Sequence, residues 1–268
     1  MMPLEDNFSD IVGKALRGLA MSEADAAAAA GISADEVRNL LDGEFDETTV
    51  QALAPVLGLE AASLARIARG AFAPQAAPPP WLVSVTTDFG GMTVNAYVVW
   101  DLETRHAAIF DTGADAGPLL DVVKRNELEV VAIFLTHSHA DHIGALARLQ
   151  KAVGAEAWSS ELEPVPGTKR FRPGDLFNAG RHFIRTRLTC GHSPGGTTFL
   201  IEGQVVKVAI VGDALFAGSI GGVRGDYTAA LEHIRREIFT LPDDTIICPG
   251  HGPMTTVGQE KTGNPFFA

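Results

Sequence analysis

The chain carries, at residues 136–144, the sequence Thr-His-Ser-His-Ala-Asp-His-Ile-Gly. This segment follows an apolar run rich in β-branched and aromatic side chains, which predicts a buried parallel strand ending in a polar site. Alternate side chains of an extended segment share one face, so His137 and His139 can reach the same ion. A helix beginning near Asp141 would direct Asp141 and His142 toward a point beside that ion. Imidazole and carboxylate donors without thiolate favour zinc, iron or manganese in a site that is not merely structural.

Three later segments each place one more candidate ligand after an apolar stretch. They are Gly-His-Ser-Pro-Gly-Gly at residues 191–196, Gly-Asp-Ala-Leu at residues 212–215 and Pro-Gly-His-Gly-Pro at residues 249–253. Together with the His-x-His-x-Asp-His motif, this set resembles the metallo-β-lactamase superfamily. Within the superfamily, the chain looks most like the glyoxalase II-like hydrolases. The resemblance runs from about Trp81 to the C-terminus.

The resemblance implies a site for two divalent metal ions. It assigns His137, His139 and His192 to the first ion, Asp141, His142 and His251 to the second ion, and Asp213 to a bridge between them. Zinc is the expected metal, with iron and manganese as alternatives. Two such ions lower the pKa of a shared water, so that a bridging hydroxide attacks a carbonyl.

The resemblance also assigns roles to individual carboxylates. Asp141 and Asp213 are the expected catalytic residues. Asp111 follows another predicted strand, where an Asp in this family holds ligand imidazoles in place. The physical reason is general, because a ligand His donates its second N–H to a carboxylate or carbonyl.

The implied activity is hydrolysis of a small-molecule thioester, and a glutathione thioester is the candidate substrate. A thiolate leaves without a strong general acid, which suits this substrate class. The hydrolase branch usually continues with an arginine directly after the Ser-Ile-Gly stretch, whereas here two residues precede Arg224. The candidate substrate contacts are Arg224, Tyr227 and Lys261.

Two other functions remain open from the sequence. An iron persulfide dioxygenase would bind one ion through His137, His192 and Asp213. A DNA-binding regulator would use the metal site as a sensor domain.

Residues 1–72 predict a separate, all-helical domain of five short helices. Ser22 and Ser33 are suited to begin helices, and Gly31 is suited to end one. Helix, glycine-containing turn and helix form a helix-turn-helix pattern, and the segment resembles the lambda-repressor-like family. Residues 1–70 hold five basic and twelve acidic side chains, and only Arg38 is cationic on the presumed recognition helix. A phosphate-binding surface needs several cations, so we expect packing, homodimer formation or shaping of the substrate cleft instead of nucleic-acid binding.

A proline-rich linker at residues 73–80 is expected to be extended and without a partner of its own. The catalytic domain at residues 81–268 alternates strands and helices, which predicts an α+β fold of the αββα sandwich type. Residues 161–180 are expected to form a loop and a hairpin. The predicted helices are 117–126, 143–153 and 229–239, and the predicted strands are 82–87, 93–100, 107–110, 130–135, 155–159, 184–189, 198–201, 205–211 and 245–248.

The overall composition limits the possible partners and location. The 268 residues carry a formal net charge of −12, which disfavours nucleic acid and anionic membranes as partners. No signal-peptide pattern and no membrane-spanning run is found, so the expected location is the cytoplasm. The two cysteines, Cys190 and Cys248, are expected to be small buried residues and not a disulfide.

Overall fold

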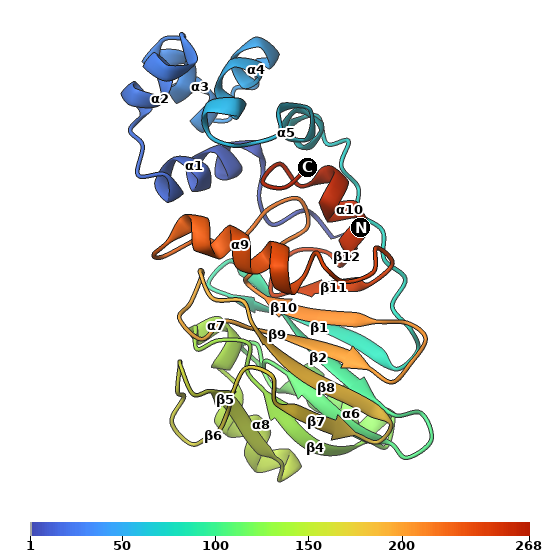
Figure 1. The fold of residues 1–268 in the computed structure, drawn as a ribbon. Helices are drawn as coiled ribbons and strands as arrows, with labels where there is room; N and C mark the ends of the chain where they lie inside the picture. The colour runs from blue at the N-terminus through green and yellow to red at the C-terminus, as the bar shows by residue number, and fades with distance from the viewer. Residues whose placement is uncertain (1) are drawn as a thin grey trace.

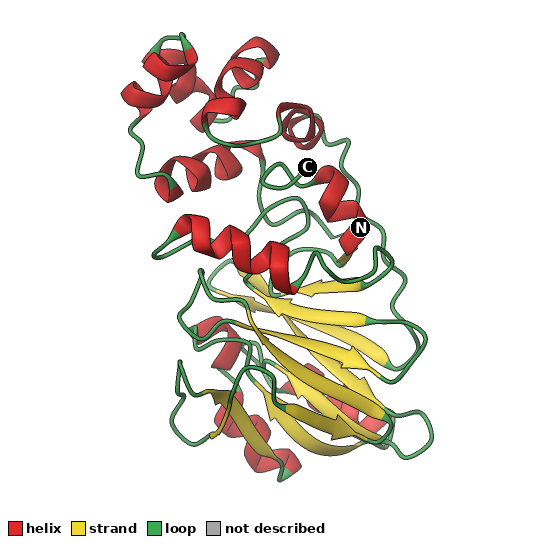
Figure 2. Ribbon diagram, in the orientation of Figure 1, coloured by secondary structure: helices red, strands yellow, loops and turns green. Residues whose placement is uncertain are grey.

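Two six-stranded mixed sheets lie face to face in the computed structural model, which describes residues 2–268 (Figure 1; Figure 2). The first sheet contains, in spatial order, β1 (Leu82–Phe89), β2 (Met92–Trp100), β3 (His106–Phe110), β4 (Glu129–Phe134), β5 (Glu156–Ser160) and β6 (Lys169–Phe171). The second sheet contains, in spatial order, β12 (Thr255–Thr256), β11 (Ile246–Pro249), β10 (Val208–Gly212), β9 (Thr197–Glu202), β8 (His182–Leu188) and β7 (Leu176–Ala179). The alternation of strands and helices in the sequence therefore gives the two-sheet sandwich that it predicts.

Helices cover the outer face of each sheet. Helices α6 (Gly117–Arg125) and α8 (Leu146–Val153) pack on the first sheet through Leu119 and Leu149. Helices α9 (Tyr227–Glu237) and α10 (Val257–Gly263) lie beside the second sheet and share an apolar core with it. No helix within residues 2–268 is both long and apolar enough to cross a lipid bilayer.

The space between the sheets is filled by large apolar side chains from both. Phe110 and Phe134 of the first sheet contact Phe199 of the second, with ring centroids 5.2 and 5.3 Å apart. All three rings are fully buried. Each buried aromatic side chain contributes roughly 1.5–3 kcal/mol, so this layer holds the ends of the strands in a fixed relation.

The helix predicted over residues 143–153 is two helices. Helix α7 (Ala140–Ile143) ends before Gly144, and α8 starts two residues later. The backbone N–H of Ala145 donates to the carbonyl of Gly113, 3.0 Å away, instead of continuing one helix. A side chain at Gly144 would lie 3.0 Å from the carbonyl oxygen of Ala140, so glycine permits the tight break.

Two other segments differ from the sequence prediction. Residues 161–180 form no hairpin of their own, because β6 joins the first sheet and β7 joins the second. Helix α10 and strand β12 are not predicted. The strand predicted over residues 205–211 starts only at Val208, since Val205 is exposed to solvent.

The N-terminal segment forms five short helices (Figure 1). They are α1 (Phe8–Gly18), α2 (Glu23–Ala30), α3 (Ala34–Leu41), α4 (Glu47–Val56) and α5 (Ala61–Ala68). The hydroxyls of Ser22 and Ser33 accept hydrogen bonds from the first turns of α2 and α3, and Gly31 ends α2 with a positive φ of 69°. These local signals are confirmed because each satisfies backbone groups that a helix end leaves unpaired.

This helical unit shares one apolar core with α9, α10 and the outer face of the second sheet. The following proline-rich segment also has a partner, contrary to the sequence expectation. The N–H of Gln75 donates to Gln259 Oε1 on α10, and Gln259 Nε2 donates to the carbonyl of Gln75. Both donor–acceptor distances are 2.7 Å. A single amide side chain therefore satisfies both backbone groups of Gln75.

Candidate metal centre

The seven candidate ligands come from loops at the ends of β4, β8, β10 and β11. Their positions follow from the chain order: His137 and His139 lie between β4 and α7, Asp141 and His142 lie in α7, His192 lies between β8 and β9, Asp213 directly follows β10, and His251 follows β11. Strands β10 and β11 are parallel neighbours, so Asp213 and His251 emerge at the same edge of the second sheet. The sandwich thus brings together side chains that lie up to 114 residues apart in the sequence.

The first group consists of three imidazoles and one carboxylate. His139 Nδ1 lies 3.0 Å from His137 Nε2 and 2.9 Å from His192 Nε2. Asp213 Oδ2 lies 3.3 Å from His192 Nε2 and 3.8 Å from His137 Nε2. One potential ligand atom from each of these residues lies within 4.8 Å of the others, which is the spacing of donors around a single ion.

The second group lies beside the first. Asp141 Oδ2 is 3.5 Å from His142 Nε2 and 3.2 Å from His251 Nε2. Asp213 reaches this group as well, with Oδ1 3.3 Å from His142 Nε2 and Oδ2 3.4 Å from His251 Nε2. The Asp213 carboxylate therefore lies between the two groups and contacts both.

Hydrogen bonds to the far side of the imidazoles fix which nitrogen is free. The Nδ1 atoms of His192 and His251 donate to backbone carbonyls of Gly222 and Thr93, at 2.9 and 2.6 Å. His142 Nδ1 lies 2.8 Å from Asp111 Oδ2. A neutral imidazole donates through one nitrogen only, so in each neutral ring Nε2 carries a lone pair aimed into the site. This arrangement is the one found around metal-bound histidines.

Two buried polar atoms at the centre have no hydrogen-bond partner. They are His142 Nε2 and Asp213 Oδ1, which lie 3.3 Å apart. Unpaired buried polar atoms are rare because they lose their hydration without compensation. A lone pair and a carboxylate oxygen left facing the same space fit a divalent cation, so the residues present match the metal group.

The ionisation of the site follows from the proximity of acids to imidazoles. Burial would raise the pKa of Asp141, but its hydrogen bond to His251 and the nearby charge of His142 together outweigh burial and lower this pKa to about 2. Burial would lower the pKa of His251, but hydrogen bonds to Asp141 and Asp213 raise it to about 10. The carboxylates therefore stay ionised at neutral pH and hold a proton on His251, which an incoming cation displaces.

Asp111 forms hydrogen bonds that hold the loop between β4 and α7, which carries His137 and His139. Besides its contact with His142, its carboxylate accepts hydrogen bonds from Thr136 N–H at 2.7 Å and from Thr136 Oγ at 2.8 Å. Asp111 has a positive φ of 57°, which is uncommon for a residue other than glycine and turns the carboxylate toward these partners. The structure therefore places Asp111 where the sequence analysis expects it, against a candidate ligand.

A cavity of about 390 Å³ opens onto the two groups. Of the predicted substrate contacts, only Arg224 lines it. Tyr227 is buried with its ring packed against Gly18 of α1, and Lys261 pairs with Asp243 at 2.7 Å. Neither Tyr227 nor Lys261 is among the cavity-lining residues, because each already has a partner elsewhere in the described part of the chain.

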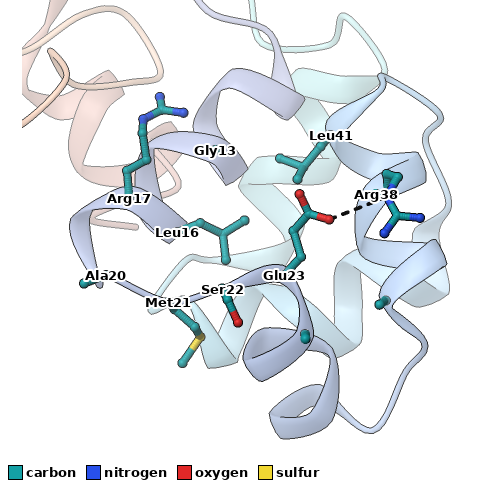
Figure 3. Close-up of a pocket in the computed structure, with 11 residues that line it drawn as sticks. Gly13, Leu16, Arg17, Ala20, Met21, Ser22, Glu23, Arg38 and Leu41 are labelled. Carbon is teal, nitrogen blue, oxygen red and sulfur yellow. Dashed lines mark ion pairs between the residues drawn. The ribbon is translucent and has the colours of Figure 1, made fainter.

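A larger cavity, of about 600 Å³, lies in the helical unit (Figure 3). Its walls include Leu16 of α1 and Leu41 of α3, and Glu23 of α2 pairs with Arg38 of α3 at 3.7 Å. This cavity contains none of the seven candidate ligands. Size alone therefore does not identify the site of chemistry.

Two residues at the site are absent from the sequence predictions. Glu163 accepts hydrogen bonds from the N–H groups of Ser138 and Gly195, at 2.8 and 2.9 Å, and so ties together the loops that carry His139 and His192. Glu5 lines the cavity although it belongs to the N-terminal segment. Neither position lies near a ligand motif in the sequence, so no local pattern could have identified it.

Comparison with known proteins gives one family and several relatives. A sequence profile described as "Metallo-beta-lactamase superfamily" matches residues 89–251. Hydroxyacylglutathione hydrolase GloC of Haemophilus influenzae is 36% identical over an alignment of 199 positions, which covers 65% of this chain and 92% of that protein. Human mitochondrial persulfide dioxygenase ETHE1 is 30% identical over an alignment of 178 positions, which covers 63% of this chain and 69% of that protein.

The solved structure of BLEG-1 B3 metallo-β-lactamase is also similar. It superposes with a TM-score of 0.61 at 33% identity and covers 69% of this chain and 100% of that one. The profile match begins after the five N-terminal helices and includes all seven candidate ligands.

Proposed function

The chain belongs to the metallo-β-lactamase superfamily, and from this premise we propose that it is a hydrolase that cleaves thioesters with two divalent metal ions. The observation that carries the proposal is the position of Asp213. Its carboxylate lies 3.3 Å from His192 in one group of candidate ligands and 3.3 Å from His142 in the other. A single carboxylate shared by two complete donor sets favours two ions over one.

We propose that the residues divide between the two ions in the way that the sequence resemblance implies. The first ion would be held by His137, His139 and His192, the second by Asp141, His142 and His251, with Asp213 shared. Zinc is the proposed metal, and iron and manganese suit the same donors. Two ions bound here would lower the pKa of a shared water and polarise the substrate carbonyl.

The protein's own side chains position the metal ligands and line the substrate cavity. Asp141 and Asp213 contact His142 and so hold the candidate ligands at fixed distances from one another. Asp111 keeps the lone pair of His142 Nε2 directed into the site. Met92 and Phe216 give the cavity an apolar wall against which the acyl part of a thioester could pack. A thiolate leaving group needs no proton from a side chain, so the proposal requires no general acid among the cavity-lining residues.

We propose thioesters and not other esters as the substrate class because one relative acts, by its name, on a thioester. GloC is by name a hydroxyacylglutathione hydrolase, and the chain spans 92% of its length. We propose the same reaction class here, with a glutathione thioester as the first compound to test.

The helical unit at residues 1–72 is proposed to shape the cleft and not to bind nucleic acid. On α3, the presumed recognition helix, Arg38 already pairs with Asp35 at 2.7 Å and lies 3.7 Å from Glu23. A cation shared with two neighbouring carboxylates is a poor contact for phosphate, which supports this assignment.

Elemental analysis of protein purified without added metal tests the proposal together with a thioester assay that follows thiol release. Two ions per chain and rapid thiol release from a glutathione thioester are expected. One iron per chain, with oxygen uptake on a persulfide and no thiol release, would replace the proposal with persulfide dioxygenase chemistry.

A further inference from the structure

Glu5 belongs to the N-terminal segment but lies at the metal-centre cavity. It shares the cavity wall with Asp141 and His251 and is about half-buried. Its backbone nitrogen lies 3.0 Å from the position that a side chain at Gly252 would occupy, so it packs directly against the residue after His251. Gly252 has a φ of +72°, which glycine adopts without strain and which lets the two backbones approach.

Contacts on both sides of Glu5 hold it there. The preceding Leu4 packs against the apolar core that the helical unit shares with the second sheet. The following Asp6 pairs with Lys14 of α1, and Lys14 Nζ donates to the carbonyl of Ile220 at 2.7 Å. Lys14 also lies 5.0 Å from the ring centroid of Phe216, another wall of the cavity. The segment is therefore anchored to the loop that carries Asp213 and does not merely pass over the opening.

Two residues of opposite charge, Glu5 and Arg224, line the cavity at different places. Glu5 lies beside the group formed by Asp141, His142 and His251, because it packs on Gly252. Arg224 lies beside the other group, because its backbone N–H donates to the carbonyl of Gly191, next to His192, at 3.0 Å. A substrate in the cavity thus has the acidic Glu5 on one side and the basic Arg224 on the other.

We propose that Glu5 is a substrate-selecting residue: the N-terminal segment supplies a carboxylate that favours acyl substrates carrying a cationic ammonium group near the scissile bond over those carrying an anionic group there. This inference rests on the proposed function and names the substrate class of the same site. Charge complementarity of this kind acts through attraction of one substrate and repulsion of the other. The helical unit is in this respect part of the substrate site.

Three acetyl thioesters test the inference with similar shapes and different charges. The thiol parts are thiocholine, 3-mercaptopropionate and 2-mercaptoethanol, which are cationic, anionic and neutral. In Glu5→Gln, the ratio of kcat/KM for the cationic to the anionic thioester is expected to fall about tenfold, since the substitution removes both an attraction for the cationic substrate and a repulsion of the anionic one. The neutral thioester serves as the reference for each protein, and metal content is measured alongside.

Two further variants sharpen this test. Arg224→Gln should raise the same ratio, because it removes the cation that attracts an anionic substrate. Glu44→Gln removes an exposed carboxylate of the helical unit that does not line the cavity, so its ratio should equal that of the unaltered protein. A Glu5→Gln ratio within twofold of the unaltered protein, at equal metal content, would overturn the inference.

A binding measurement separates this inference from the proposed function. The free thiols thiocholine and 3-mercaptopropionate are titrated into cobalt-loaded protein, and the absorbance change gives a Kd for each. A Kd ratio that shifts toward the anionic thiol in Glu5→Gln supports the selecting role even if no thioester is hydrolysed, in which case only the proposed function fails. Unchanged Kd ratios overturn the selecting role even if thioesters are hydrolysed.

Discussion

The Nδ1 nitrogen of His142 lies 2.8 Å from the Oδ2 oxygen of Asp111, and both residues are buried, with 0% and 2% exposure. The hydrogen bond determines that Nε2 of His142 is the nitrogen that faces Asp213. Because the same carboxylate also accepts from Thr136 N–H and Oγ, Asp111 couples the orientation of one candidate ligand to the course of the ligand loop.

Asp111→Asn should weaken metal binding without removing a ligand. An amide has one acceptor oxygen where Asp111 uses two, so either His142 or Thr136 loses its partner. Loss of such a supporting hydrogen bond lowers metal affinity about 10- to 100-fold. Chelator competition measures the affinity, and Asp115→Asn, an exposed change in the same loop, is the control. Equal affinities in the two variants would contradict the orienting role of Asp111.

Asp213→Ala and Asp141→Ala should differ in the number of ions lost. Asp213 contacts both donor sets, whereas Asp141 contacts only His142 and His251. We expect Asp213→Ala to lose most of both ions and Asp141→Ala to retain close to one per chain. Elemental analysis after dialysis gives the counts. Two firmly held ions in Asp213→Ala would rule out the shared position proposed for this carboxylate.

The sequence predicts the sandwich well because its signals are local. Apolar β-branched runs mark strands such as β4, and serine and glycine mark the helix ends of the N-terminal unit. The seven ligand candidates are also predictable, since four of them lie within six residues and the other three follow apolar strands. The structure brings all seven into two adjoining groups.

The remaining features depend on contacts between distant segments. The break at Gly144 depends on the carbonyl of Gly113, and the partner of Gln75 is a side chain 184 residues away. Glu5 reaches the cavity only because α1 is anchored on the loop after β10. Periodicity and motif spacing carry no information about such pairs, which is also why Tyr227 could not be distinguished from a residue at the cavity.

The two cysteines should differ sharply in reactivity. Cys248 is 0% exposed, and burial raises the pKa of its thiol well above the usual range. Cys190 is partly exposed, and its Sγ lies 3.1 Å from His233 Nδ1. Because the thiolate is the reactive form, we expect one thiol per native chain to react with a disulfide reagent, and two after unfolding. Peptide mapping should place the native label on Cys190, and Cys190→Ser should leave none. Native labelling of Cys248 would contradict the burial described here.

Glu260→Gln should change how stability depends on pH. Burial raises the pKa of the Glu260 carboxyl to about 7, despite hydrogen bonds from Gly218, Thr255 and Asn264. An acid with a raised folded-state pKa contributes stability at low pH and loses that contribution as pH rises from about 4.5 to about 7. Glutamine can keep the hydrogen bonds without ionising.

Urea unfolding of both proteins at pH 5 and pH 8 measures this effect. The free energy of unfolding of the unaltered protein should fall by roughly 2–3 kcal/mol relative to Glu260→Gln between the two pH values. All other titrating groups are shared, so they cancel in the difference. Parallel pH profiles for the two proteins would show that Glu260 ionises normally.

Gly18→Ala should loosen the attachment of the helical unit. Gly18 is the last residue of α1, and a side-chain carbon there would overlap the ring of Tyr227 at the start of α9. The backbone of Gly18 is not in the left-handed region, so the cost of alanine comes from this overlap and not from its own conformation. Overpacking of this kind costs about 1–3 kcal/mol.

A second substitution shows whether the cost of Gly18→Ala comes from overlap with the Tyr227 ring. Tyr227→Leu removes the ring, so in its presence Gly18→Ala should cost far less, and a double-mutant cycle on the free energy of unfolding measures the difference. Gly43→Ala is a poor control because its φ of 90° strains alanine, whereas Gly222→Ala would alter the cavity. Ala29→Gly on the exposed face of α2 changes one methyl group without touching α9, so its cost of about 0.5–1 kcal/mol reports helix propensity alone. If Gly18→Ala costs the same with and without the Tyr227 ring, the helical unit is not attached through this contact, and the anchoring of Glu5 depends on Lys14 and the apolar core alone.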